Sequence, residues 1–433
     1  MSINQNFPNV WPSLVLDFEN SKTLDPRITF TRSSVGTYVD EDGLIKTAAA
    51  DEARFDYDPE TGESLGLLIE EQRTKVRNNV SYPLGSLSAT SSTDITAPDG
   101  TTSGIIKITS PSFTNTSGVQ QRSVDTSYFA HTVVQNVYYS SSIYMYATGS
   151  TDNSRKIDIG IVAGGCIDAP GGVTLSSCGY IDGQNVVSST SPLTNTILPK
   201  DRWVRVFVNW RSPCNGGAGN FGGQIRVLYN ITNNLQNTNF INSSGNPVIY
   251  LWGSTVETNY STGSASFPTS YIYGNNVTRQ PDKAQITGTN FTDWYNSSEG
   301  TIFTESNIYS LENLQNFTEF QIDDGTQTNR IFHYFAQSND SAKFQAWGSD
   351  VEVQGNSAIA NTDLKHASSY NSSSYITCLN SSLSSTGTTG TQVALNEAHI
   401  GWNHSGNYLN GHIKQLRYYP ERLTNTQLQN LTK

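Results

Sequence analysis

The chain has 433 residues, of which 35% are apolar and 11% aromatic, and its net charge at pH 7 is −11. A composition with few apolar residues but many large rings favours thin β-sandwiches, in which each buried ring covers a large area. Disordered chains have fewer aromatic residues and more charge than the 15% found here, and the negative net charge excludes a general nucleic-acid-binding surface.

The first 80 residues carry a dense mixture of acidic and basic side chains, whereas the rest is rich in Ser, Thr, Asn and Gly. Two β-prone runs in this segment, residues 28–34 and 36–46, alternate with period two around Asp42-Gly43. An Asp-Gly pair between such runs is typical of a β-hairpin. The change in charge predicts an N-terminal module of residues 1–80 that ends near a linker.

A short acidic stretch follows the hairpin, with carboxylates at Asp56, Asp58 and Glu60. Gly62 lies one position late for an EF-hand loop, and no bidentate Glu stands at the twelfth position. We therefore expect a plain turn and no cofactor. Calcium bound by other loops of the sandwiches is an alternative that the sequence leaves open.

Residues 81–282 contain short β-prone runs separated by polar turns, which is typical of a sandwich or jelly roll. We expect the following aromatic residues on its inner face: Tyr144, Tyr146, Trp203, Phe207, Tyr250 and Trp252. Residues 283–433 also contain short β-prone runs separated by polar turns. They end in a short helix, for which Thr424 is the expected N-cap.

Three parts of the chain carry a family resemblance. Residues 24–74, LDPRITFTRSSVGTYVDEDGLIKTAAADEARFDYDPETGESLGLLIEEQRT, closely resemble an N-terminal block of many tail-associated proteins of bacteriophages and prophages. The segments YLWGSTVE, FPTSYIYG and VTRQPDKAQITG are similar to the strand-and-crossover region that follows this block. HIGWNHSGNYLNGHIKQLRYYPERLTNTQLQNL is similar to the closing strands and helix of laminin-G or concanavalin-A-like domains in that group.

This resemblance implies an all-β phage virion protein of the tail-fibre or adhesin type. It would have an anchoring module (1–80), a jelly-roll-like sandwich (81–282) and a concanavalin-A/laminin-G-like sandwich (283–433). Its implied partners are other virion proteins and host surface polysaccharide, and such proteins are commonly homotrimers. The alternatives are a capsid-decorating or head fibre protein without a specific receptor, and a tailspike polysaccharide depolymerase.

The start of the chain shows no signal peptide, and no apolar run approaches the ~18 residues of a membrane span. We therefore expect a protein made in the host cytoplasm without insertion into a membrane. The family resemblance implies that it is located in the virion, at the phage tail or particle surface.

The sequence predicts neither a catalytic site nor a metal-binding site. In EFQIDDG, Glu319 and Asp323 share a strand face, but about 13 Å of strand separates them, whereas a retaining glycosidase needs ~5.5 Å between its carboxyl groups. His399, His404 and His412 are five and eight residues apart across a strand and a loop, which is not a metal-ligand spacing. The sequence thus predicts a protein that is not an enzyme and has no metal centre.

Two sets of residues are candidates for binding. A sugar site requires an exposed aromatic face with planar polar groups nearby. The loop WNHSGNY supplies these groups through Trp402, Asn403, His404, Asn407 and Tyr408. For attachment to subunits or virion proteins, the candidates are charged residues of the N-terminal block, because Arg forms bidentate pairs with carboxylates. These are Arg27, Arg32, Asp40, Asp42 and Arg54.

Overall fold

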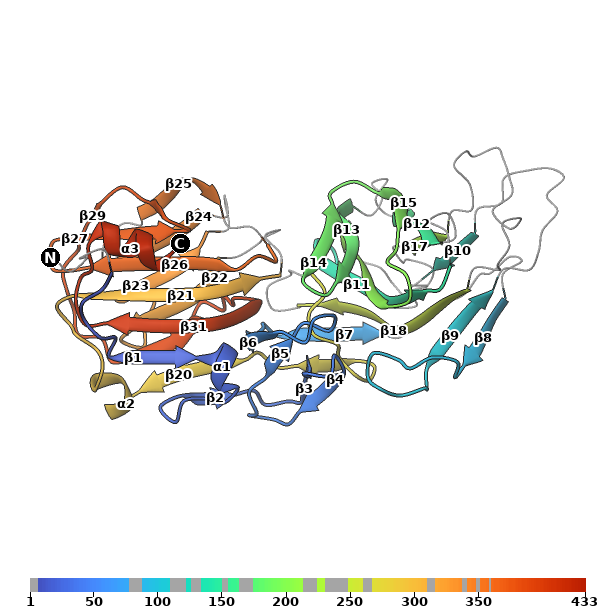
Figure 1. Cartoon of the computed structure of the whole chain (residues 1–433), viewed down its shortest axis with the longest axis horizontal. Helices are drawn as coiled ribbons and strands as arrows, with labels where there is room; N and C mark the ends of the chain where they lie inside the picture. Colours follow the sequence, from blue (N-terminus) through green and yellow to red (C-terminus); the bar gives the residue numbers. More distant parts are fainter. Residues whose placement is uncertain are drawn as a thin grey trace, which may run out of the picture. The chain divides into compact units, whose positions relative to one another are not determined.

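A computed structural model of the chain describes thirteen stretches of residues. They are 7–77, 88–109, 122–125, 134–149, 155–162, 174–212, 224–229, 248–259, 267–309, 316–336, 341–347, 351–357 and 360–433. Contacts within the chain define two compact units. Unit 1 comprises residues 1–42, 47–72 and 280–433, and unit 2 comprises residues 43–46 and 73–279. Both are built from β-sheets, which confirms the predicted all-β class (Figure 1).

Unit 1 contains a nine-stranded sheet. Its strands are β1 (Leu14–Asp17), β5 (Phe55–Tyr57), β6 (Ser64–Ile69), β21 (Gly300–Ile308), β26 (Leu364–Tyr370), β27 (Ser374–Leu379), β28 (Ser382–Leu383), β29 (Gly387–Thr388) and β31 (Gly411–Tyr419). The order is β28-β27-β26-β21-β31-β6-β5, with β1 paired to β31 and β29 paired to β27.

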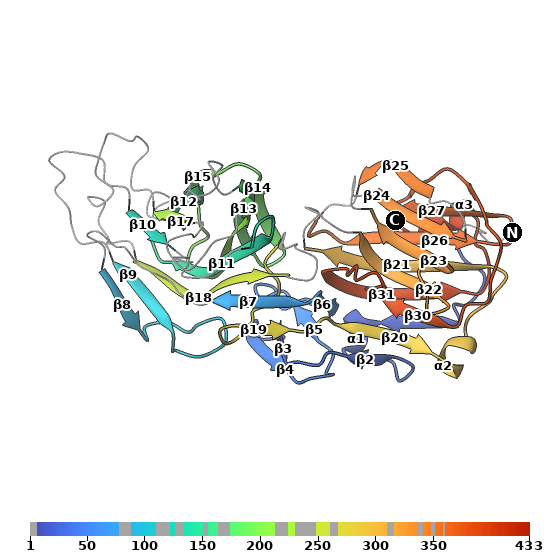
Figure 2. The same cartoon turned by 180° about the vertical axis from the view of Figure 1, so that it is seen from behind.

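A seven-stranded sheet forms the second layer of unit 1 (Figure 2). Its strands, in spatial order, are β2 (Thr29–Thr31), β20 (Lys283–Thr287), β30 (Glu397–Ile400), β22 (Phe317–Asp323), β23 (Arg330–Phe335), β24 (Ser341–Ala346) and β25 (Val351–Ser357). One apolar cluster contains residues of both sheets, among them Ile302 and Leu416 from the first and Phe320 and Ile331 from the second. Unit 1 is therefore a β-sandwich.

The N-terminal strands belong to this sandwich. Leu14 to Asp17 pair with residues 415–418 of β31, residues 67–69 pair with residues 411–413 along the same edge of β31, and Thr29 to Thr31 pair with β20. The sequence suggested a separate module for residues 1–80, but up to residue 72 these strands lie in one unit with residues 280–433. The reason is that Leu14, Leu16 and Leu67 complete the core of the sandwich.

The three helices are short and belong to unit 1. They are α1 (Phe18–Ser21), α2 (Thr289–Thr292) and α3 (Asn425–Leu431). Thr424 caps α3 in a capping box with Gln427, which confirms the predicted N-cap. None of the helices among the described residues has the length and apolar character needed to cross a bilayer.

The predicted hairpin around Asp42-Gly43 is also confirmed. β3 (Gly36–Val39) and β4 (Ile45–Ala48) form a two-stranded sheet, and Gly43 has a φ of 75° in the turn between them. Asp58 closes the next turn, since its Oδ1 accepts hydrogen bonds from the N–H groups of Glu60 and Thr61. This is the plain turn that the sequence predicts.

Unit 2 contains a nine-stranded and a four-stranded sheet. The larger one consists of β7 (Arg73–Arg77), β8 (Ser88–Ser92), β9 (Ile105–Thr109), β11 (Tyr138–Ala147), β13 (Thr174–Asp182), β14 (Asn185–Ser189), β16 (Trp203–Arg211), β18 (Val248–Thr258) and β19 (Val277–Arg279). The smaller one consists of β10 (Arg122–Asp125), β12 (Lys156–Val162), β15 (Leu193–Ile197) and β17 (Gln224–Tyr229).

The large sheet of unit 2 is apolar on both faces. One face packs with β12 and contains, among others, Ile143, Val206 and Leu251. The other face carries a second cluster, in which Ile45, Ala97 and Ile105 pack on aromatic rings of β11, β16 and β18. Most of the predicted inner-face rings lie in this second cluster and not in the main core: Tyr144, Tyr146, Trp203, Tyr250 and Trp252.

Candidate functional site

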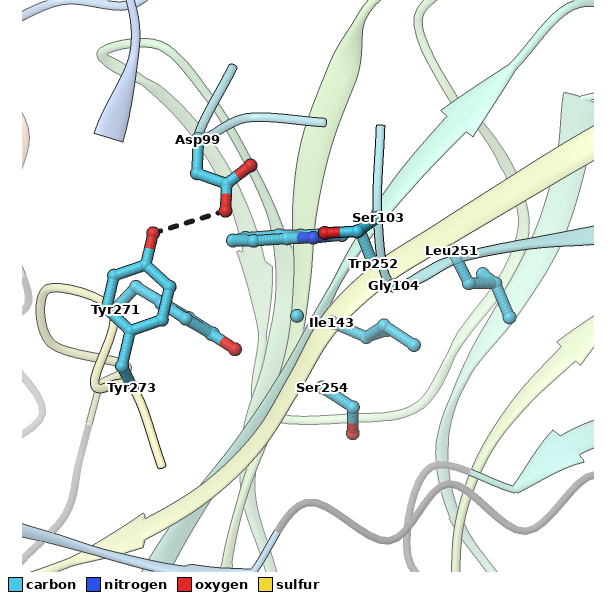
Figure 3. A pocket seen from close by; sticks show the side chains of 10 residues that line it. Asp99, Ser103, Gly104, Ile143, Leu251, Trp252, Ser254, Tyr271 and Tyr273 are labelled. Carbon is cyan, nitrogen blue, oxygen red and sulfur yellow. Dashed lines mark hydrogen bonds between the residues drawn. The ribbon is translucent and has the colours of Figure 1, made fainter. Parts of the chain in front are cut away.

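The aromatic face of unit 2 contains a pocket of about 420 Å³. Its lining residues come from four segments: the loop before β9, the middle of β11, the middle of β18, and the segment after residue 267 (Figure 3). They are Asp99, Ser103, Gly104, Ile143, Leu251, Trp252, Gly253, Ser254, Tyr271 and Tyr273. This volume lies in the range of small-molecule sites.

A β-bulge on β18 shapes the floor of the pocket. Ser142 pairs with Thr255 and Tyr144 pairs with Trp252, so Gly253 and Ser254 together oppose the single residue Ile143. Gly253 has a φ of 63°, and a Cβ there would lie 3.1 Å from the ring of Tyr271. Only glycine fits this position without strain. The bulge thus places two small residues beside Trp252 and leaves space above them.

A tight turn holds the carboxylate of Asp99 at the pocket. Its Oδ1 accepts hydrogen bonds from the backbone N–H and the hydroxyl of Thr101 at 3.0 and 2.8 Å. Its Oδ2 accepts a hydrogen bond from the hydroxyl of Tyr273 at 3.3 Å (Figure 3). One oxygen therefore fixes the turn, and the other is bonded to Tyr273, which also lines the pocket.

The opposite wall is the segment that carries Tyr271 and Tyr273. Glu257 of β18 binds Thr269 at the start of this segment, and Arg205 of β16 donates a hydrogen bond to the Thr269 carbonyl. Burial raises the pKa of Glu257, although neighbouring arginines act in the opposite direction. The wall is therefore anchored to the sheet by buried polar contacts.

Lys75 of β7 supports Tyr271 from inside unit 2. Its Nζ lies 4.3 Å from the centre of the Tyr271 ring and donates hydrogen bonds to the Tyr271 hydroxyl and to the carbonyl of Ile272. Lys75 is fully buried, and this burial, together with the charge of Arg205, lowers its pKa to about 7. An aromatic face and two oxygens thus bind the ammonium group at a buried position, where burial disfavours its charged form.

The aromatic rings at the pocket become more exposed from the core toward the solvent. Trp252 and Tyr271 are buried with ring centres 4.8 Å apart, and Tyr273 packs edge-on against Tyr271 while 39% of it stays exposed. Burial raises the pKa of Tyr271 to about 12, so its hydroxyl remains a neutral hydrogen-bond donor at pH 7. The arrangement offers an apolar ring surface beside a hydroxyl and a carboxylate.

The loop predicted to bind sugar is folded differently from that expectation. Trp402 and Tyr408 are 4% and 7% exposed, and Nε1 of Trp402 donates a hydrogen bond to the carbonyl of Ala284. Asn403 is buried and closes the loop by accepting hydrogen bonds from the N–H groups of Ser405 and Asn407. Of the five predicted residues, only His404 is exposed, so the loop lacks the exposed aromatic face on which that prediction depended.

The predicted attachment residues divide into two groups. Arg32 and Arg54 are fully buried and share the carboxylate of Asp282, and Arg54 also pairs with Glu70 at 2.8 Å. They stabilise unit 1 and present no charge to a partner, because their carboxylate partners lie in the same unit. Arg27 forms a partly exposed pair with Asp25.

The acidic attachment candidates lie at the β3–β4 turn. Oδ1 of Asp40 accepts a hydrogen bond from the N–H of Asp42 at 3.1 Å. This contact shapes the hairpin turn, and attachment through these two residues stays a prediction.

Two groups of imidazoles and carboxylates in unit 1 have ligand atoms close enough to share a cation. The first, Glu319, His333 and His366, is fully buried and bonded to hydroxyl groups of Thr304, Ser306, Ser368 and Thr377. Its donors and acceptors satisfy one another, which is typical of a structural network. The second group is Asp323, Glu397, His399 and His404.

The sequence did not single out Asp99, Tyr271 or Tyr273, which form the pocket. The available signals were weak: an Asp-Gly pair at the turn and two tyrosines at i and i+2, which share a strand face. Asp99 and Tyr273 are 174 residues apart, and no local pattern links them.

No family model and no curated protein matches the chain. Solved structures with partial likeness include the CBM40 module of a Ruminococcus gnavus IT-sialidase bound to α2,3-sialyllactose (15% identity, 31% of this chain and 82% of that chain, TM-score 0.26). Domain 4 of a GH43 extracellular arabinanase from Geobacillus stearothermophilus, in complex with arabinotriose, is similar over 40% of this chain and 84% of its own (15% identity, TM-score 0.28). The receptor-binding domain of botulinum neurotoxin mosaic serotype C/D is similar over 35% of this chain and 39% of its own (10% identity, TM-score 0.28). Scores of this size assign neither a family nor a ligand to the chain.

Proposed function

We propose that this chain is a carbohydrate-binding protein that holds a neutral sugar in the pocket of unit 2. The observation that carries the proposal is the pairing of the exposed Tyr273 ring with the fixed carboxylate of Asp99. The apolar C–H face of a pyranose packs on an aromatic ring, and a carboxylate accepts hydrogen bonds from its hydroxyl groups. Oδ2 of Asp99 accepts one hydrogen bond from Tyr273 and has a second lone pair for a sugar hydroxyl.

The charge of the pocket favours neutral sugars over acidic ones. Asp99 is the charged side chain among the described residues that line it, and the nearby Lys75 is buried beneath Tyr271. A sialic or uronic acid would place its carboxylate near that of Asp99 without a cation between them, and like charges in a partly buried site repel.

The same lining favours binding over hydrolysis. A glycosidase of the usual kind needs two carboxyl groups around the scissile bond. Asp99 is the single carboxylate among the described lining residues, and one of its oxygens is engaged by Thr101. The pocket therefore supports recognition of a sugar without cleavage.

In the wider setting that the family resemblance suggests, this protein would be a phage tail-fibre component that attaches the virion to host surface glycans. Its virion location, its virion partners and a homotrimeric state stay predictions.

A glycan array followed by isothermal titration calorimetry tests the proposal on the full chain. We expect neutral oligosaccharides to bind and sialylated or uronic-acid oligosaccharides not to bind. Tyr273→Ala should weaken binding at least tenfold, which corresponds to about 1.4 kcal/mol. Tyr273→Phe keeps the ring and should weaken it less, and Asp99→Asn should weaken it through loss of the strong acceptor. Trp11→Ala removes an 88% exposed ring of unit 1 and serves as the control.

An oligosaccharide-release assay on the same sugars separates binding from cleavage. Steady product formation that Asp99→Asn abolishes would show a depolymerase. Binding that survives both Tyr273→Ala and Asp99→Asn would place the sugar elsewhere and contradict the assignment of this pocket.

A further inference from the structure

The second group of imidazoles and carboxylates lies where β22 ends and β30 begins. In the antiparallel register of these strands, Asp323 is directly opposite Glu397 and Gln321 is directly opposite His399. Side chains two residues apart on a strand share a face. Asp323, Glu397 and His399 therefore project from the same face of the seven-stranded sheet at one end of the strand pair.

The loop after β30 brings His404 to the same place. Trp402 and Tyr408 form a β-bridge, and Asn403 closes the turn between them. This folding back places the ring of His404 4.5 Å from that of His399, centre to centre. Four side chains from two strands and one loop thus converge.

Four nitrogen–oxygen distances in this group, two of them to different oxygens of Asp323, are close to the edge length of a coordination tetrahedron. Nε2 of His399 lies 3.3 Å from Oδ2 of Asp323 and 3.4 Å from Oε1 of Glu397. Nε2 of His404 lies 3.2 Å from Oε1 of Glu397 and 3.6 Å from Oδ1 of Asp323. Bonds of about 2.0–2.2 Å from zinc to imidazole and carboxylate place the corners of a tetrahedron about 3.3–3.5 Å apart.

Burial and charge supply an independent argument for a ligand. His399 is fully buried, and neither of its ring nitrogens makes a hydrogen bond within the described residues. Asp323 and Glu397 are two carboxylates directly opposite each other on neighbouring strands, an arrangement that repels. A cation at the centre would bind Nε2 of His399, which lies 3.3 Å from Oδ2 of Asp323, and would neutralise both carboxylates.

Hydrogen bonds from Gln321 and Gly325 orient the carboxylate of Asp323. Oδ2 of Asp323 accepts a hydrogen bond from Nε2 of Gln321 at 2.6 Å, and Oδ1 accepts one from the N–H of Gly325 at 2.8 Å. Such contacts fix the direction of a metal-binding carboxylate. Glu397 and His404 are 20% and 33% exposed in their side chains, so an ion can reach the group from solvent.

We propose that Asp323, Glu397, His399 and His404 bind a divalent transition-metal ion, with Zn²⁺ as the best fit. Two imidazoles and two carboxylates in a tetrahedron suit Zn²⁺, whereas Ca²⁺ takes six to eight oxygen ligands and Mg²⁺ takes an octahedron of oxygens. Four protein ligands close the tetrahedron, so the ion has a structural role. It links the turn of residues 401–410, through His404, to the ends of β22 and β30.

The experiment uses the untagged full chain, freed of metal by a chelator. Titration with Co²⁺ should give the intense visible absorption of tetrahedral Co²⁺, and Zn²⁺ should displace it at one equivalent. Zn²⁺ should also raise the unfolding temperature in calorimetry, because an ion that binds only the folded state stabilises it. Ca²⁺ at the same concentration should do neither.

Three variants assign the ligands. His404→Ala and Glu397→Gln change partly exposed side chains, so the chain should fold, and each should weaken Zn²⁺ binding at least 100-fold. Asp324→Asn, next to Asp323 and outside the group, should bind Zn²⁺ as the wild type does. Zn²⁺ binding unchanged in both ligand variants, or stabilisation by Ca²⁺ equal to that by Zn²⁺, would overturn the proposal.

Discussion

Glu257 binds Thr269 through both of its carboxylate oxygens: Oε1 accepts a hydrogen bond from the backbone N–H at 3.0 Å, and Oε2 accepts one from the hydroxyl at 2.5 Å. Glu257 lies on β18, the strand that carries Trp252, and Thr269 precedes Tyr271 by two residues. The contact therefore connects the floor of the pocket with its wall, and neither Glu257 nor Thr269 lines the pocket itself.

Thr269→Val should test this positioning role. The variant removes the hydroxyl and leaves Oε2 of the buried Glu257 without that donor, which should lower the free energy of unfolding by about 1–3 kcal/mol. Sugar affinity should fall several-fold, because Tyr271 and Tyr273 lose part of their support. Calorimetric titration and urea unfolding measure the two effects. Thr258→Val is the matched control, since its hydroxyl binds the carbonyl of Tyr138 away from the pocket and its loss should leave affinity unchanged.

Lys75→Met should make the protein more stable at pH 7 and remove a pH dependence. The pKa of Lys75 is about 7 in the folded chain against an ordinary value of 10.5. Between these values the unfolded chain binds a proton that the folded chain does not, so stability rises with pH by about 1.4 kcal/mol per unit. Below pH 7 the folded chain carries the full cost of the buried charge. Urea unfolding at pH 7, 8 and 9 should show this rise in the wild type and not in the variant.

Lys107→Met is the control for that series. Lys107 pairs with Asp94 at the surface, and the Asp94 hydrogen bond raises its pKa, so it stays charged throughout this range. Its loss should keep the slope of the wild type. An equal slope in Lys75→Met and the wild type would show that Lys75 does not titrate here.

Local features of the fold were predictable from the sequence because their causes are local. The Asp42-Gly43 hairpin depends on the residues of the turn, and the start of α3 depends on Thr424 and Gln427, three residues apart. Long-range pairing has no such signal. Nothing in residues 14–17 indicates that they pair with residues 415–418, because any apolar strand of suitable length could lie at that position.

The residues of the two candidate sites were harder to predict for two physical reasons. Alternation along β11 and β18 separates Ile143 and Leu251 from Tyr144 and Trp252, but both sets are apolar, so the pattern does not tell which face is the core. The imidazoles of His399 and His404 meet because a turn folds back, a geometry that the five-residue spacing does not reveal.

Asp282→Asn should destabilise unit 1 far more than Arg27→Ala. Asp282 is the buried carboxylate shared by Arg32 and Arg54, and removing the charge leaves two buried guanidinium groups without their common partner. We expect a loss of about 3–5 kcal/mol. Arg27 and Asp25 form a partly exposed pair, for which the loss should stay below about 1 kcal/mol. Calorimetric unfolding of both variants measures the difference, and similar losses would contradict the buried network.

His366→Gln should reduce the sensitivity of unit 1 to acid. Burial lowers the pKa of His366 to about 3 from an ordinary 6.5, and burial also holds the pKa of His333 well below its usual range. As the pH falls from 6.5, these imidazoles become protonated in the unfolded chain but stay neutral in the folded chain. The free energy of unfolding therefore falls by about 1.4 kcal/mol per pH unit for each imidazole. Glu319 opposes this change, because burial raises its pKa and it takes up a proton first in the folded chain.

With two imidazoles against one carboxyl group, the net loss of stability in acid should be measurable by urea unfolding at pH 7, 6 and 5. His366→Gln should be less stable at pH 7, because it loses the contacts with Glu319 and Thr377, but its stability should change less with pH. Thr377→Val is the matched control, since it removes the same hydroxyl partner and keeps the imidazole. It should be destabilised with the slope of the wild type, and a wild-type slope in His366→Gln would show that this buried imidazole does not cause the acid sensitivity.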